Sequence, residues 1–195
     1  MKQIGITGGI GSGKSQIASF FLLLSVPVYN SDDRAKLLMN SDNQLIEGIK
    51  ELFGEASYID GKIDRGYISS KLFKDTLLLQ KMNELVHPSV EKDYKNWLSQ
   101  QSSFYTIKES ALLVETGGYK KLDQLICVAT PENIRLQRVL KRDTHRSKET
   151  IKSIIRNQTT DEEKSKVADY LIKNDNSTLI IPQLLKLHTE VFMKS

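Results

Sequence analysis

A glycine-rich segment near the start of the chain carries the residues best suited to do chemistry. Residues 8–15 have the sequence GGIGSGKS, which matches the phosphate-binding pattern G-x-x-x-x-G-K-[ST] at every fixed position. Glycines allow the tight turns that point consecutive main-chain N–H groups at phosphate oxygens. Lys14 is expected to reach the β- and γ-phosphates of a nucleoside triphosphate, and the Ser15 hydroxyl to hold Mg²⁺. The alternative is a glycine-rich turn without a ligand.

The residues on either side of this segment fit a phosphate-binding loop (P-loop). Residues 3–7 form a short apolar run that predicts a buried strand, and residues 16–24 predict a helix. The start of such a helix adds a positive dipole end to the amides of the loop. The order strand, loop and helix therefore favours a nucleotide site, although it does not say what happens to the phosphate.

Two acidic residues follow the next predicted strand, at residues 26–29. In open α/β sheets ligands bind beyond the carboxyl ends of the strands, which is where Asp32 and Asp33 come. Asp32 could take a proton from an attacking hydroxyl, or hold Mg²⁺ directly or through water. The alternative is that Ser31 or Asp32 caps a helix predicted at residues 34–39, and the two roles are compatible.

Composition limits the kinds of partner. The 195 residues suit about one domain, and the net charge of +4 comes from basic residues scattered among acidic ones. A nucleic-acid-binding track would gather them on one element with aromatics, so we expect no nucleic acid partner. The apolar run at residues 17–24 is too short for a bilayer, so we expect no membrane span. One cysteine, Cys127, allows no disulfide within the chain, and we expect a cytoplasmic protein without a signal peptide.

Short strands alternate with helices along much of the chain. Strands are predicted at residues 3–7, 26–29, 104–107, 125–129 and 170–172. Helices between them include residues 132–141, a charged helical stretch over 141–166, and residues 181–192. This alternation predicts an α/β fold, a parallel sheet of the P-loop NTPase type flanked by helices.

One stretch departs from the alternation. Helices are predicted at residues 44–53, 65–73, 77–86 and 90–101, with a turn-like segment at residues 58–62. This block is too long for a simple crossover, so residues 42–101 are expected to form a helical insertion. We therefore expect a single domain over residues 1–195, with residues 1–41 and 102–195 as its core.

Two other nucleotide-site patterns are missing. No strand of four apolar residues ends in Asp, the Walker B pattern, because Ala129 follows the apolar run at residues 125–128. The guanine-recognition tetrapeptide N/T-K-x-D is also missing. Both absences disfavour a GTPase switch or a mechanical ATPase and leave the small-molecule kinases.

Shorter motifs follow the P-loop in order. The loop itself extends back to Thr7, and the second predicted strand ends in Asn30-Ser31-Asp32. Further along come His87-Pro88, Ala111–Glu115 with Tyr119 behind it, Pro131-Glu132 with Arg138 and Arg142-Asp143, and Ala168–Asn174. In this order the motifs resemble those of the dephospho-coenzyme A kinase family, and the resemblance covers nearly the whole chain.

The resemblance implies ATP-dependent phosphorylation of the ribose 3′-hydroxyl of dephospho-coenzyme A, with Mg²⁺. Asp32 would orient the hydroxyl and take its proton, while Lys14 offsets charge on the transferring group and Ser15 holds the metal. The implied nucleotide-binding residues are Gly11, Ser12, Gly13, Lys14, Ser15, Gln16, Arg138 and, against adenine, Asn174.

Arginines at spacings of four suggest a moving element. Arg138 and Arg142 fall on one helical face, while Arg146 lies near or past the end of that helix. One interpretation is a lid over about residues 138–166, which brings Arg142 to the phosphates as a catalytic residue. The alternative is a solvated basic face paired with acidic neighbours, namely Glu132, Asp143 and Glu149.

The acceptor side is assigned by resemblance, with the insertion as the wall that receives the coenzyme A moiety. The implied substrate-binding residues are Asp32, Arg65, His87, Leu112, Leu113, Glu115 and Tyr119. Three have plain alternatives: Arg65 could only start a helix, His87 could be a helix-end histidine before a proline, and Tyr119 could be packing.

This chain departs from the family pattern at four places. Gln16 replaces a threonine, Asn30 replaces the first acid of the D-A-D-like turn, and Ala111 replaces a proline. The fourth is Ile154, where the family often has an arginine. None of these changes touches Lys14 or Asp32. The alternatives are another small-molecule kinase, a nucleotide-dependent binding module without catalysis, and a nucleic-acid-binding protein. We expect a monomer or a small homo-oligomer.

Overall fold

A computed structural model describes residues 1–72, 75–144 and 146–193. The chain divides into two compact units, one of Met1–Asn30 with Gln101–Ser195 and one of Ser31–Gln100. The first unit carries the sheet and the P-loop. The second begins at Ser31, whereas the sequence placed the start of the helical insertion near residue 42.

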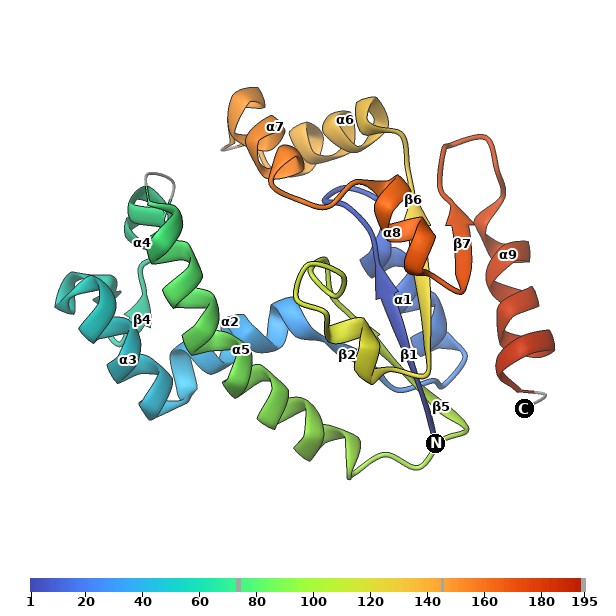
Figure 1. Ribbon diagram of the computed structural model, residues 1–195, viewed down its shortest axis with the longest axis horizontal. Coiled ribbons are helices and arrows are strands. Elements are labelled where there is room, and N and C mark those ends of the chain that lie inside the picture. The colour runs from blue at the N-terminus through green and yellow to red at the C-terminus, as the bar shows by residue number, and fades with distance from the viewer. Residues whose placement is uncertain (73–74, 145, 194–195) are drawn as a thin grey trace. The chain divides into compact units, whose positions relative to one another are not determined.

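The sheet of the first unit has five parallel strands in the order β2-β5-β1-β6-β7 (Figure 1). Their bounds are β1 (Lys2–Thr7), β2 (Val28–Asn30), β5 (Tyr105–Glu109), β6 (Gln124–Ala129) and β7 (Tyr170–Lys173). The predicted parallel sheet is therefore confirmed. The central strand β1 has no free edge, because β5 and β6 pair with it on either side.

Helices flank this sheet. They are α1 (Lys14–Leu23), α6 (Glu132–Arg142), α7 (Lys148–Arg156), α8 (Asp161–Val167) and α9 (Ile180–Lys186), with short helical turns at Gly118–Lys121 and Leu187–Phe192. The core gathers Ile4 and Ile6 of β1 with Phe21 of α1 and Phe192 at the end of the chain. This packing fixes α1, and with it the end of the P-loop, against the central strand.

The second unit is mainly helical. Its elements are α2 (Ser31–Ser41), α3 (Asn43–Phe53), a 3-10 turn (Glu55–Ser57), β3 (Tyr58–Ile59), β4 (Lys62–Ile63), α4 (Arg65–Leu72) and α5 (Thr76–Leu98). The predicted turn at residues 58–62 is the tip of a hairpin. Asp60 and Gly61 take φ values of 49° and 74° there, the left-handed pair that tight hairpins favour.

Two helix boundaries in this unit were predicted wrongly. Residues 77–86 and 90–101 are not separate helices, because α5 runs through Pro88. Proline removes one helical hydrogen bond, but an apolar stripe at spacings of four continues across it, formed by Met82, Val86, Val90 and Tyr94. In addition, α2 begins at Ser31, so Asp32 lies inside its first turn, where a carboxylate suits the helix dipole.

The outer strand β7 is closed by a side chain. Gln183 of α9 accepts a hydrogen bond from the main-chain N–H of Lys173 and donates one to its carbonyl, both at 3.0 Å. The amide therefore takes the place that a neighbouring strand would fill. Among the described helices none is both long and apolar enough to cross a membrane.

Candidate active site

The P-loop joins β1 to α1 in a conformation that needs glycine. Gly13 has a φ of 94° directly before α1, and Gly11 has a φ of 78°. A Cβ on Gly11 would also lie 2.6 Å from the main-chain oxygen of Arg135. Both positions are thus closed to other residues, by backbone conformation and, for Gly11, by the close approach of α6.

Lys14 lies within the loop. Its side chain is buried at 7% exposure, and its Nζ donates a hydrogen bond to the carbonyl of Gly9 at 3.3 Å. Ser15 and Gln16, the next two residues of α1, are exposed. A buried cation beside the start of a helix and an exposed serine is the arrangement that triphosphate and Mg²⁺ require.

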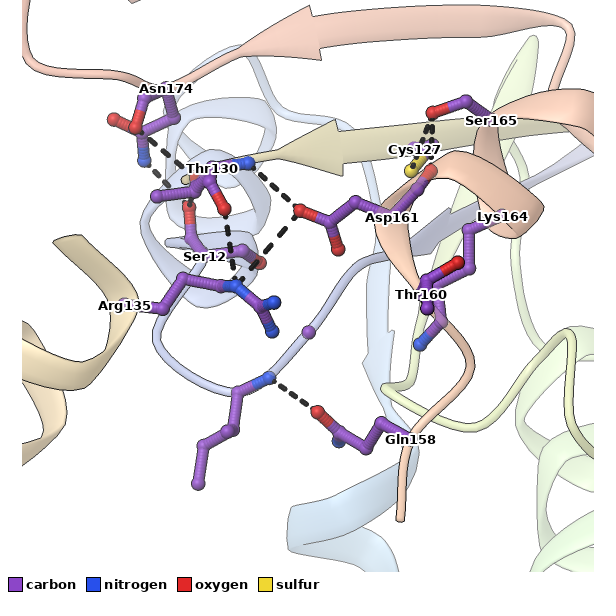
Figure 2. A network of polar contacts seen from close by, with 12 residues as sticks. Ser12, Cys127, Thr130, Arg135, Gln158, Thr160, Asp161, Lys164, Ser165 and Asn174 are labelled. Carbon is purple, nitrogen blue, oxygen red and sulfur yellow. Dashed lines mark hydrogen bonds and ion pairs between the residues drawn. The ribbon is translucent and has the colours of Figure 1, made fainter. Parts of the chain in front are cut away.

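Two neighbouring strand ends hold the loop in place. The carbonyl of Ser12 accepts hydrogen bonds from Asn174 Nδ2 at 2.7 Å and from Thr130 Oγ1 at 3.1 Å. Thr130 follows β6 and Asn174 follows β7, as Figure 2 shows. The side chain of Asn174 is thus engaged by the loop, and its predicted contact with adenine stays a prediction.

A second set of contacts reaches the loop from α6 and α8. Asp161 Oδ2 accepts a hydrogen bond from the N–H of Thr130 at 3.0 Å and lies 4.0 Å from Nε of Arg135. The same Nε donates to the carbonyl of Thr130 at 3.1 Å, and Gln158 Oε1 accepts from the N–H of Ile10 at 2.8 Å (Figure 2).

Sequence reasoning gave Arg135 and Asp161 no role. The available signal was that Arg135 shares a helical face with buried Val139.

The arginine series splits into two environments. Nη2 of Arg138 donates to both oxygens of Asn174, at 3.2 Å and 3.1 Å, so Arg138 supports the loop anchor. Arg142 Nε pairs with Asp143 at 2.7 Å, and Arg146 lies past the end of α6 with Nη1 3.7 Å from the same carboxylate. The lid and the catalytic role of Arg142 stay predictions, since the side chain here pairs with its acidic neighbour.

The turn after β5 is held by a buried lysine. Lys164 of α8 has no exposed surface, and its Nζ lies 2.9 Å from Glu115 Oε1 and 3.0 Å from the carbonyl of Ala111. Glu115 also accepts a hydrogen bond from the N–H of Thr159 at 3.0 Å. The predicted substrate residue Glu115 therefore links this turn to the start of α8.

The other residues predicted here differ in exposure. Leu113 is 3% exposed and faces β1, where its Cδ1 would lie 3.1 Å from a Cβ on Gly5. Leu112 and Tyr119 are partly exposed. Leu113 thus packs in the core, while the surfaces of Leu112 and Tyr119 remain available.

An acid that the sequence reasoning missed lies beside the P-loop strand. Glu109 ends β5, is 2% exposed, and stands in register with Ile6 of β1 and Asn30 of β2. Its carboxylate accepts a hydrogen bond from the side-chain amide of Asn30. The predicted strand stopped at residue 107, so this position was not recognised. The apolar run at residues 125–128, which lacks a following Asp, forms part of β6, whereas the strand-end acid is the last residue of β5.

Three predicted residues belong to the second unit. Asp32 lies in the first turn of α2, Arg65 is the first residue of α4, and His87 lies within α5. The alternative for His87, a helix-end histidine, is wrong because the helix continues through Pro88. The encounter of these three residues with the phosphate loop stays a prediction.

Metal ligands are sparse in the part of the chain that the structure describes. There, no three His, Cys, Asp or Glu side chains gather into a metal-binding group. Mg²⁺ that arrives with a nucleotide takes most of its ligands from phosphates and water, so one hydroxyl and one carboxylate suffice. The exposed Ser15 hydroxyl fits that need.

Comparison with known proteins finds relatives that match nearly the whole chain. A family model described as dephospho-CoA kinase matches residues 2–179. A dephospho-CoA kinase of Bacteroides fragilis is 35% identical over 193 residues, covering 98% of this chain and 94% of the relative. The crystal structure of TT1252 from Thermus thermophilus is 31% identical, has a TM-score of 0.84, and is matched over 99% of this chain and 97% of that chain.

A second solved structure supports the fold. A dephospho-CoA kinase from Campylobacter jejuni has a TM-score of 0.70 at 24% identity, with 98% of each chain covered. The matches span nearly the whole chain and include both the anchored P-loop and the helical second unit. This chain belongs to the dephospho-CoA kinase family.

Proposed function

We propose that this protein transfers the γ-phosphoryl group of ATP to the ribose 3′-hydroxyl of dephospho-CoA, giving CoA and ADP. The observation that carries the proposal is the buried Lys14 inside a P-loop whose Ser12 carbonyl is fixed by Asn174 and Thr130. Because residues 2–179 match the family, the acceptor named for the relatives is the first one to test here.

Charge neutralisation is the main task of the loop. The transition state of phosphoryl transfer is loose, so fixed positive groups and alignment matter more than the strength of the base. Lys14 offsets the charge on the transferring group, while the amides from Gly11 to Gln16 wrap the phosphates. Asp32 orients the acceptor hydroxyl and takes its proton.

Magnesium would be held by Ser15 together with a carboxylate, either Asp32 or Glu109, directly or through water. When bound, it would offset negative charge on the phosphates. Glu109 joins Ser15 and Asp32 as a candidate ligand, because it ends the strand next to β1 and its carboxylate is oriented by Asn30.

The remaining predicted residues receive narrower roles. Arg142 leaves Asp143 for the phosphates when the lid over about residues 138–166 closes, and Arg138, at the first residue of that segment, is the fixed end that keeps its contact with Asn174. Arg65 and His87 contact the acceptor from the second unit, and Leu112 and Tyr119 do so from the turn after β5. Leu113 and Glu115 support that turn, Leu113 by packing against β1 and Glu115 by its contacts with Lys164 and Thr159. We place the enzyme in the cytoplasm, consistent with a single cysteine that is buried and free.

The decisive experiment is ADP release from ATP and Mg²⁺ with different acceptors. We expect release to depend on dephospho-CoA, to give CoA, and to be lost in the Lys14→Ala variant. Preference for adenosine monophosphate or shikimate would identify a different small-molecule kinase. ATP binding without any acceptor-dependent release would instead identify a binding module.

A further inference from the structure

A buried guanidinium lies directly behind the P-loop and is not used in the mechanism above. Arg135 projects from α6 and is 7% exposed, although arginine is among the residues least often buried. Its Nε donates to the carbonyl of Thr130 at 3.1 Å. The side chain is therefore held in one orientation rather than solvated.

The guanidinium packs against the backbone of the loop. A Cβ built on Gly9 would lie 1.9 Å from Nη1 and 2.8 Å from Cζ of Arg135. Only a glycine hydrogen leaves room for the planar group at this distance. The cation is thus in contact with the segment whose next residues carry the phosphate-facing amides.

One carboxylate balances this charge only in part. Asp161 Oδ2 lies 4.0 Å from Nε, too far for a hydrogen bond, and receives the N–H of Thr130 instead. Figure 2 shows a dashed line from Asp161 directly to Arg135, with Thr130 beside them and in contact with both. The guanidinium therefore places a positive charge beside the loop.

We propose that Arg135 is a positioning residue for ATP: its guanidinium braces Gly9 and Thr130 and adds fixed positive charge behind the phosphate amides. It acts through the loop and touches no substrate. Its loss should therefore weaken the binding of the nucleotide selectively, because the acceptor does not depend on the position of Gly9. The inference needs only ATP binding, so it can fail while the acceptor proposed above is correct, and the reverse also holds.

The test uses the full chain with Arg135→Gln and Arg135→Lys, and Lys186→Gln as the control. Lys186 is exposed on α9, so its change removes the same charge far from any assigned role. Calorimetric titration with ATP in the absence of acceptor gives the dissociation constant. Kinetics with each substrate varied in turn separate KM from kcat, and thermal denaturation reports folding.

We expect Arg135→Gln to weaken ATP binding about tenfold, as for loss of a buried charged hydrogen-bond donor. The KM for dephospho-CoA should change less than about twofold, Arg135→Lys should recover part of the loss, and Lys186→Gln should match wild type. Unchanged ATP affinity, an equal loss for both substrates, or no recovery with lysine would overturn the proposal. If Arg135→Gln does not fold, Arg135→Lys decides alone. A rise of about threefold in the dissociation constant for ATP, with the KM for dephospho-CoA unchanged, supports the role, and unchanged ATP affinity refutes it.

Discussion

The ammonium group of Lys164 lies 2.9 Å from Glu115 Oε1 and is wholly inaccessible to solvent. The same group donates to the carbonyl of Ala111. One lysine of α8 thus satisfies a carboxylate and a main-chain oxygen of the turn after β5. Removing the lysine leaves the partly exposed Glu115 without its counter-charge and the carbonyl of Ala111 without its donor.

Lys164→Met should therefore lower the free energy of unfolding by about 2 kcal/mol, as for the loss of hydrogen bonds to a charged group. In a chain of this size that corresponds to a fall in melting temperature of roughly 4–8 °C. Lys166→Met is the matched control, because Lys166 is exposed on the same helix. Equal melting temperatures for the two variants would show that the pair of Lys164 and Glu115 contributes nothing to stability.

Asp32→Asn should reduce kcat at least about a hundredfold while ATP affinity stays near that of wild type, because only the acceptor hydroxyl loses its proton acceptor. Asp33→Asn is the control, since Asp33 is exposed and pairs with Lys36 at 2.6 Å. Lys14→Ala should lower kcat further than Asp32→Asn, given that charge neutralisation dominates a loose transition state. Near-normal turnover by Asp32→Asn would refute the role assigned to that carboxylate.

Asn174→Ala should weaken ATP binding by about 1–2 kcal/mol, because the carbonyl of Ser12 loses its shorter hydrogen bond and Arg138 loses a side-chain acceptor. Titration of the variant with ATP measures this directly. Asn133→Ala, an exposed change on α6, should leave ATP affinity at the wild-type value. The anchoring role is wrong if the two alanine variants bind ATP alike.

Cys127 should resist thiol reagents in the folded protein. Burial raises the pKa of its thiol to about 11, although a hydrogen bond from Ser165 opposes the shift. At pH 8 the native protein should react with a disulfide reagent far more slowly than the urea-unfolded chain. Comparable rates for the two forms would show that the thiol is accessible.

The same shift predicts how stability depends on alkaline pH. The folded state keeps the thiol proton up to about pH 11, whereas the unfolded thiol loses it near the ordinary value of 9.0. The contribution of the buried thiol to the free energy of unfolding is therefore complete below pH 9 and is lost as pH rises toward 11, by up to roughly 2 kcal/mol. Cys127→Ala should flatten that part of the urea-unfolding profile, and an unchanged slope would contradict the assignment.

The strands and the P-loop could be predicted because their signals are local. An apolar run, a glycine pattern and a helix follow one another within the first residues of the chain, and the structure keeps that order. The predicted helix break at Pro88 was wrong because a non-local effect outweighed a local one. Proline disfavours a helix interior, but the stripe of apolar residues on α5 packs within its own unit and keeps the helix continuous.

Most of the P-loop supports could not be predicted from local pattern. Thr130 and Asn174 reach Ser12 across 118 and 162 positions of sequence, so only the strand order brings them together. Lys164 and Arg135 belong to residue types that are usually solvated, and the only sequence signal of burial is the spacing of four between Arg135 and Val139. Glu109 was not recognised because the strand ends in two polar residues, Lys108 and Glu109, which the sequence pattern places outside it. Both are nevertheless buried.

The side-chain amide of Gln183 has a consequence for how the protein behaves in concentrated solution. By bonding both main-chain groups of Lys173, it denies a second molecule the place where a foreign strand would add to the sheet. Leu171, on the same strand, is 47% exposed and would favour such an addition. A shorter residue at position 183 should leave kcat unchanged but make the protein aggregate faster at high concentration, as measured by turbidity.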